Sequence, residues 1–404
     1  MARQLKRAGF EVVGAYPRGR AGGRSFTCPR PLRYPSPVET PDAFVAWVSE
    51  TCRRHDVDAV VPVDEDIVRL LSRNRGALGR AVFVGPTEEQ YALLCDKRRL
   101  SDTARELGLD SPMTVEVDDE GHSPEWPPLP SVVKPRTSGS EIDAPRMVDT
   151  EEERDALVKH LARSGYGAVV QERIDGQRWI VQSVRGDGVF EYVVHRVDLE
   201  WPRGCGLATL KRPSADHAAL AASAKKLLDH VDYRGPSGIS FLEQDGRFYP
   251  HDANLRLGAT MVASVNAGFD FPRRAVEAVM GLPGRPFDGT PIPGAVQMRL
   301  DLELEALASA VKGRDGATAK RILVNIAKVA VNPHGLLDPS PVNPFWVSSL
   351  AQRVLRRVRA GARTRRTPAT AAPADGGPAP ARQPLATGSD SNPAPTPASA
   401  AGAK

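Results

Sequence analysis

Short apolar segments alternate with amphipathic segments over the first 85 residues. The strand-like segments are residues 10–16, 59–62 and 81–84, and the helical ones are residues 41–55 and 64–72. Strands that alternate with helices at this spacing usually pair in parallel, with the helices as crossovers. The sequence therefore predicts an α/β domain over residues 1–86 built on a doubly wound parallel sheet. Because residues 2–8 have a helical pattern, we expect this domain to lack its first strand.

The pattern changes after Pro86 and is richer in strands. Helices are expected over residues 88–108, 150–164, 215–230 and 272–280, and strands over 131–135, 168–173, 179–198, 238–243 and 247–252. The last two strands are joined by Gln244-Asp245-Gly246, which favours a hairpin turn. We predict a second domain over residues 87–285, with a lid of mixed α+β structure at about 112–175. Residues 286–350 form a mixed extension, and residues 351–404 contain a basic segment and an Ala/Pro-rich tail that is expected to be disordered.

Charge and composition exclude several classes of protein. The formal charge is +5, but the segment from Gln352 onward carries +7, which leaves −2 on the residues before it. We therefore expect no nucleic-acid partner. No run of about 18 apolar residues is present. The basic N-terminus leads into no apolar signal segment, and the four cysteines are scattered, so we expect a cytoplasmic protein with reduced thiols.

Three segments carry groups that suit nucleotide chemistry. In the first, a strand ends at Lys134, and a loop of small residues, Ser138-Gly139-Ser140, follows. A lysine ammonium neutralises phosphate charge, and the amides of such a loop can surround phosphate oxygens. A solvated lysine before a turn is an equally open reading.

The second segment is the apolar strand that ends at Gln171-Glu172, about 37 residues after Lys134. Its backbone could pair with an adenine edge, and Glu172 could accept a hydrogen bond from the adenine amino group or the ribose. The alternative is an exposed strand end with alternating charges.

The third segment follows the hairpin turn. Period-two geometry predicts Phe248, Pro250, Asp252 and Asn254 on one strand face. A carboxylate and an amide oxygen two residues apart can bind one Mg²⁺, and Arg256 could stabilise charge on a transferring phosphoryl group. The alternative is an Asx turn at Asp252 that ends the strand.

In this order and at this spacing, the motifs resemble the ATP-grasp superfamily, in the branch of the carbamoyl-phosphate synthase and biotin carboxylase domains. The likeness covers roughly residues 1–285 and includes Asp96-Lys97, Val133-Lys134-Pro135, the segment from Gln171 to Gly176, and Asp252-Ala253-Asn254-Leu255-Arg256. Aspartate replaces the family's glutamate in the last motif. Ser240 stands where the family has another acidic residue or glutamine.

The resemblance implies an ATP- and Mg²⁺-dependent ligase that activates a carboxylate as an acyl phosphate for attack by an amine or a similar nucleophile. Lys97, Lys134 and the loop of Ser138, Gly139 and Ser140 would hold phosphates. Gln171, Glu172 and Ile174 would hold the adenosine, Asp252 and Asn254 the metal, and Arg256 and Lys134 would act in catalysis. Because Ser240 weakens the metal site, a non-catalytic ATP-binding sensor or partner protein is the alternative.

Two further groups of residues are open to more than one interpretation. His195, Arg196, Asp198, Lys211 and Arg212 lie where the family approaches its second substrate, although a solvated strand face explains them equally simply. Trp346, Leu350, Val354 and Val358 share one face of a predicted basic helix. Residues 346–366 could make weak contact with an anionic membrane surface, or the helix could pack on its own domain.

Overall fold

The computed structural model describes residues 1–17, 28, 31–139, 145–163 and 165–337. All of them belong to the first of two units into which the chain divides, residues 1–354 and 355–404. The helix expected near residue 346 and the tail after residue 361 lie outside the described residues. No helix within the described ranges is long and apolar enough to cross a membrane.

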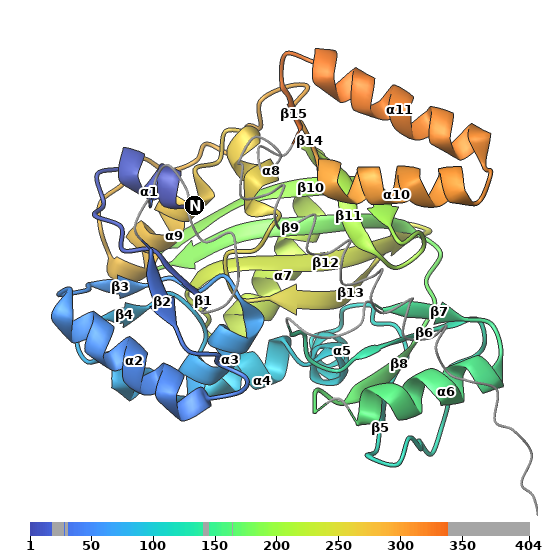
Figure 1. Cartoon of the computed structure of the whole chain (residues 1–404), viewed down its shortest axis with the longest axis horizontal. Helices are drawn as coiled ribbons and strands as arrows, with labels where there is room; N and C mark the ends of the chain where they lie inside the picture. The colour runs from blue at the N-terminus through green and yellow to red at the C-terminus, as the bar shows by residue number, and fades with distance from the viewer. Residues whose placement is uncertain (18–27, 29–30, 140–144, 164, 338–404) are drawn as a thin grey trace, which may run out of the picture. The chain divides into compact units, whose positions relative to one another are not determined.

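The N-terminal part contains two small parallel sheets and their helices (Figure 1). Its elements are α1 (Ala2–Arg7), β1 (Ala15–Pro17), β2 (Leu32–Tyr34), α2 (Pro41–Arg54), β3 (Ala59–Val60), α3 (Glu65–Arg73), η1 (Arg75–Leu78) and β4 (Val82–Phe83). The pair β3–β4 is parallel, as predicted, and β1 pairs in parallel with β2, a strand that the sequence did not predict. The two pairs are separate two-stranded sheets. Phe44, Leu71 and Phe83 form their shared core.

The single helix predicted over residues 88–108 is wrong, because the chain forms two helices there. These are α4 (Glu88–Leu94) and α5 (Lys97–Glu106). Asp96 separates them by capping α5, and its carboxylate accepts hydrogen bonds from the amides of Arg98 and Arg99 at 3.0 and 3.2 Å. The break places Lys97 at the first position of a helix.

The lid is a four-stranded antiparallel sheet with one helix against it. It consists of β5 (Thr114–Val117), β6 (Ser131–Pro135), β7 (Arg146–Val148), α6 (Glu151–Ala162) and β8 (Ala168–Glu172), with the strand order β5-β8-β6-β7. Val133 and Val170 pack with α6 in the lid core. Because neighbouring strand residues point to opposite faces, Lys134 and Gln171 lie on the face turned away from α6.

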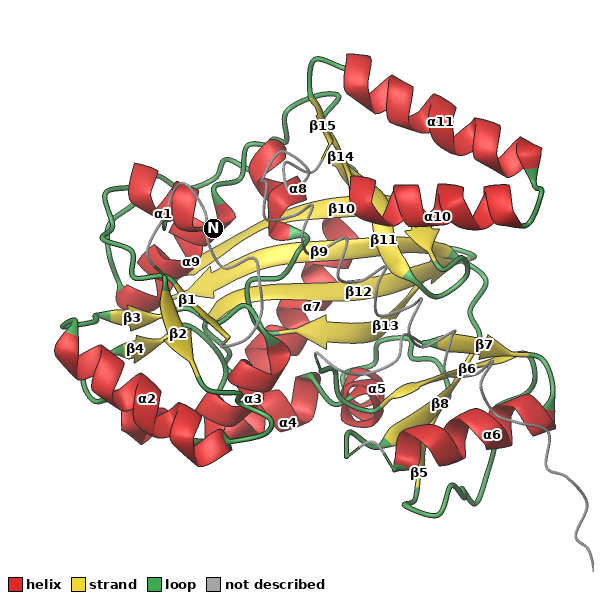
Figure 2. Ribbon diagram, viewed as in Figure 1, coloured by secondary structure: helices red, strands yellow, loops and turns green. Residues whose placement is uncertain are grey.

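A seven-stranded sheet forms the largest layer, as Figure 2 shows. Its strands are β9 (Gln177–Gly186), β10 (Val189–Trp201), β11 (Leu207–Ser214), β12 (Gly235–Gln244), β13 (Arg247–Asn254), β14 (Val296–Met298) and β15 (Gly335–Leu337), in the order β13-β12-β9-β10-β11-β14-β15. Helix α7 (Ala218–His230) packs on one face through the core that contains Ile239 and Phe241. Helices α8 (Met261–Asn266) and α9 (Phe271–Met280) lie over the other face.

Of residues 282–345, where the sequence showed no usable pattern, the described residues up to 337 complete the large sheet. They supply β14, α10 (Leu300–Lys312), α11 (Gly316–Val331) and β15, and the two helices form a hairpin. Each of these strands has three residues, which is too short for an alternation of apolar and polar positions to be seen.

A β-bulge in β13 changes which of its residues share a face. Ser240 pairs with Asp252, but Phe241 pairs with Pro250, so His251 is the extra residue. Phe248 consequently packs against the same core as Ala253, on the face opposite to Asp252 and Asn254. The prediction of one face for Phe248, Pro250, Asp252 and Asn254 is therefore wrong.

Candidate functional site

The two lysines meet where the lid approaches β13. The amide of Lys97 donates to the carbonyl of Arg136 at 3.0 Å, which fixes the start of α5 beside the end of β6. Lys97 Nζ donates to Ser138 Oγ at 3.3 Å and lies 3.4 Å from Asp252 Oδ1. Lys134 Nζ donates to Gln171 Oε1 at 2.6 Å and to the carbonyl of His251 at 3.1 Å. The bulge thus offers a backbone acceptor to a lysine of the lid.

A chain of polar contacts continues from Asp252 to the N-terminal part. Asn254 Nδ2 donates to Asp252 Oδ2 at 2.9 Å, and Arg256 Nη2 donates to Asn254 Oδ1 at 3.0 Å. Arg256 Nε then donates to Glu65 Oε2 at 2.5 Å. Lys97, Asp252, Asn254 and Arg256 form one chain of contacts, and Lys134 lies beside it on the carbonyl of His251. These five residues come from three distant parts of the sequence, and we call them the cationic cluster.

Burial and charge alter the pKa values within the cluster. Burial and, after it, the ammonium of Lys97 lower the pKa of Lys134 to about 7, while Asp252 acts in the opposite direction. Burial raises the pKa of Asp252, but Lys97, together with His251 and Lys134, more than offsets this and holds it at about 2. Asp252 is therefore ionised at neutral pH, whereas Lys134 is close to its midpoint.

We predict that nucleotide binding to this site takes up a proton above pH 7. Phosphate contact favours charged Lys134, whose pKa of about 7 in the free protein leaves it largely neutral at higher pH. The Kd for ATP should therefore rise up to about tenfold per pH unit above 7, until the pKa of the bound state is reached. Calorimetry in buffers of different ionisation enthalpy measures the uptake, and Lys134→Met should abolish it. A flat Kd between pH 7 and 9 would contradict this prediction.

The predicted adenosine residues occupy the strand end of the lid and a turn beyond it. Gln171 is buried and holds Lys134, while its Nε2 donates to Thr114 Oγ1 at 2.7 Å. Glu172 Oε2 accepts a hydrogen bond from the amide of Met113 at 3.0 Å, and Ile174 is half-buried. In this arrangement Gln171 positions a lysine, and the role of Gln171, Glu172 and Ile174 toward adenosine stays a prediction. In the phosphate loop Gly139 follows Ser138, and Ser140 lies outside the described residues.

Asp252 and Asn254 offer two protein oxygens for a metal ion. Phosphate and water oxygens could complete the coordination of one Mg²⁺. A half-turn of the Asn254 amide would present its oxygen beside the Asp252 carboxylate. Ser240, directly opposite Asp252, is a neutral hydroxyl, and Glu243 instead accepts from Trp179 Nε1 at 2.7 Å. The described residues contain no group of three or more His, Cys, Asp and Glu side chains that could hold a metal ion.

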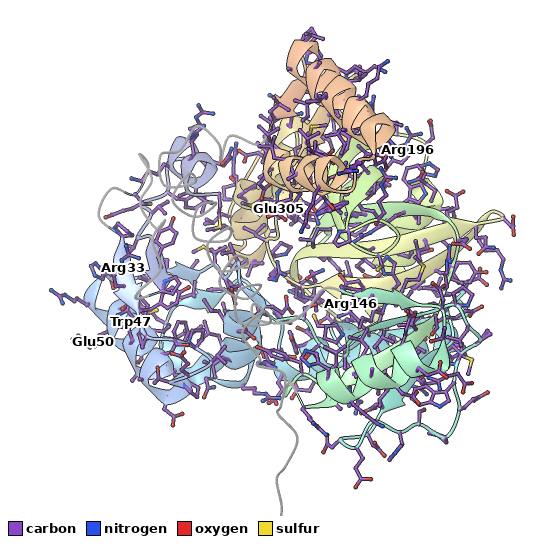
Figure 3. All side chains as sticks on the ribbon, turned by 45° about the vertical axis from the view of Figure 1, so that its right-hand side comes forward. Arg33, Trp47, Glu50, Arg146, Arg196 and Glu305 are labelled. Carbon is purple, nitrogen blue, oxygen red and sulfur yellow. The ribbon has the colours of Figure 1, made fainter. Side chains whose placement is uncertain are left out.

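The five residues expected near a second substrate divide between the two faces of the large sheet. His195 and Lys211 are buried, and His195 Nε2 lies 3.0 Å from Ser264 Oγ. Arg196, labelled in Figure 3, and Arg212 are half-exposed, and both form ion pairs with Asp198 at 2.7 and 2.6 Å. Arg196, Asp198 and Arg212 therefore fit the interpretation as a solvated strand face. Of the five residues, only His195 and Lys211 lie on the sheet face that carries Asp252.

Contacts between the lid and the N-terminal part were not anticipated from the sequence. Tyr166 Oη donates to Asp66 Oδ1 at 3.1 Å, and the Arg69 guanidinium lies 4.8 Å from the centre of the Tyr166 ring. Glu65, the neighbour of Asp66 at the start of α3, holds Arg256. Only the acidic run Asp64-Glu65-Asp66 after an apolar strand could have drawn attention to these residues.

No family model and no curated protein matches this chain. Several solved structures are similar to this chain. An L-amino acid ligase from Bacillus licheniformis is 17% identical with a TM-score of 0.59, over 73% of this chain and 74% of that one. Biotin carboxylase from Campylobacter jejuni, in complex with an ATP analogue, is 15% identical with a TM-score of 0.58, over 74% and 72%.

A third similar structure is the biotin carboxylase domain of the Hydrogenobacter thermophilus 2-oxoglutarate carboxylase, with MgADP, ADP and bicarbonate. It is 14% identical, with a TM-score of 0.57 over 74% of this chain and 71% of that one. These likenesses define the fold. The chain has the ATP-grasp fold.

Proposed function

We propose that this protein is an ATP- and Mg²⁺-dependent ligase that activates a carboxylate for attack by an amine. The observation that carries the proposal is the cationic cluster, in which a lysine of the lid, a lysine at a helix start and an Asp-Asn-Arg strand end converge. Phosphoryl transfer needs positive charge around the phosphates and little other chemistry from the protein. The ATP-grasp fold and its solved relatives support the same reaction class.

The residues suit two consecutive steps. In the first, an oxygen of the substrate carboxylate attacks the γ-phosphorus of ATP, and the bond to the β-phosphate oxygen breaks to release ADP. Lys97 and Lys134 would hold the phosphates, and Arg256 would stabilise the charge on the transferred group. In the second, the amine nitrogen attacks the carbonyl carbon of the acyl phosphate, phosphate leaves and the nitrogen loses a proton. Mg²⁺ held by Asp252 and Asn254 would neutralise phosphate charge.

A phosphate-release screen with pairs of carboxylic acids and amines tests the proposal. A productive pair should give ADP and phosphate in equal amounts, together with an amide product, and omission of either substrate should reduce release to background. A chain that ATP stabilises thermally, but that releases no phosphate with any pair, would support a non-catalytic ATP-binding protein instead. Ser240 opposite Asp252 is the observation that favours this second candidate. Absence of any stabilisation by ATP would contradict both.

A further inference from the structure

Helix α11 is apolar on two opposite faces. Ile322 and Val329 are buried, and Val329 packs with the apolar side chains of β14 and β15. Leu323, Ala327 and Val331 recur every four residues on the opposite side, where Leu323 is 55% exposed and Val331 is 81% exposed. A helix that only packs on its own domain needs a single apolar stripe, so the outer stripe remains to be explained.

The charges beside the outer stripe all have one sign. Helix α11 contains Lys320, Arg321 and Lys328 and no acidic residue. Lys320 and Lys328 share a row with Val324, which is 41% exposed, next to the row of Leu323, Ala327 and Val331. Lys312, the last residue of α10, and Arg314 in the turn before α11 add two more cations near Val311, which is 64% exposed. The acidic residue of this turn, Asp315, caps α11 by accepting a hydrogen bond from the amide of Thr318 at 2.9 Å.

We propose that this outer face of α11, formed by Lys320, Leu323, Val324, Ala327, Lys328 and Val331, docks on an anionic lipid bilayer. An interfacial helix places its apolar side chains at the headgroup and acyl boundary, and adjacent lysines contact lipid phosphates. Pairing with a second copy of the chain is disfavoured, because it would bring the two lysines of each outer face together without an acidic partner in α11.

The position of α11 in the fold leaves the cationic cluster free during docking. Helix α11 packs against β14 and β15 at one edge of the seven-stranded sheet, whereas Asp252 and Asn254 lie on β13 at the other edge (Figure 2). The inference is independent of the proposed ligase activity. It also concerns a different segment from the basic residues 346–366.

Sedimentation of the full chain with lipid vesicles tests the inference. The wild type should bind vesicles with about 30% phosphatidylglycerol far better than pure phosphatidylcholine vesicles. The double substitution Leu323→Glu and Val331→Glu should lower the bound fraction at least about tenfold, since it places carboxylates at the membrane contact. Leu207→Glu is the matched control, because Leu207 is 57% exposed on β11 and outside this face, and it should bind like the wild type.

Three results would overturn the inference. One is equal binding of the wild type and the double variant to anionic vesicles, which would assign any binding to another segment. Another is no preference for anionic over neutral vesicles, or no binding to either. The third is a dimer in sedimentation velocity that the double variant dissolves, which would make α11 an interface between copies. An unchanged melting temperature for the variant shows that lost binding is not lost folding.

Discussion

Lys134→Met is expected to reduce ATP-dependent phosphate release by about 100- to 1,000-fold, which is the usual cost of removing one group that stabilises charge in a transition state. Lys134 is 4% exposed and is held by Gln171 and by the carbonyl of His251, so no other side chain can easily take its place. Methionine matches the unbranched apolar part of the lysine side chain and lacks its ammonium group. Steady-state phosphate release with a productive substrate pair measures the effect.

Lys159→Met, on the exposed surface of the same lid, is the matched control and should retain wild-type turnover. Near-normal thermal unfolding of both variants would separate lost chemistry from lost folding. Wild-type turnover in a folded Lys134→Met variant would mean that this lysine does not contact the nucleotide.

Asp252→Asn should produce a loss of similar size and should also change the response to Mg²⁺. The substitution preserves shape but removes the carboxylate that pairs with Lys97 and that we assign to the metal. Because a neutral amide is a weaker ligand than a carboxylate, the Mg²⁺ concentration for half-maximal turnover should increase at least about tenfold. Titration of Mg²⁺ at saturating ATP measures this change.

The control for this second substitution is Asp198→Asn, whose carboxylate pairs with two arginines on the opposite sheet face. It should leave the Mg²⁺ dependence unaltered. If Asp252→Asn gives the wild-type Mg²⁺ curve, the metal lies elsewhere and the assignment of Asp252 and Asn254 fails.

The ordered motifs predicted the fold well because each marks a strand end of a known architecture. Lys134, Asp252 and Asn254 could be chosen from the sequence, since a lysine after an apolar strand and an Asp-x-Asn pair are visible locally. The structure places them in one group, whereas their roles toward ATP and Mg²⁺ stay predictions.

Other parts of the site could not be predicted, for physical reasons. The pairing of Arg256 with Glu65 joins residues 191 positions apart, and no local pattern encodes such a contact. The hydrogen bond between Tyr166 and Asp66 also depends on how the lid meets the N-terminal part. The helix break at Asp96 was missed because helical periodicity continues on both sides of the capping residue. The hydrogen bond from Lys134 to Gln171 was also missed, because the two residues lie on neighbouring strands and 37 positions apart in the sequence.

The extra residue at His251 decides on which face of the sheet Asp252 and Asn254 lie, so the site depends on the backbone of β13 as well as on its side chains. If the same residues alternated regularly, without a bulge, Asp252 and Asn254 would share the face of Phe248, and their side chains would turn toward the apolar layer under α7. A relative could therefore keep every acidic and amide residue in its sequence and still lose the site if its strand ran without the bulge. When homologous chains are compared, the number of residues between the hairpin turn and the Asp-x-Asn pair should be counted, because a strand one residue shorter needs no bulge to hold the pair opposite Ser240.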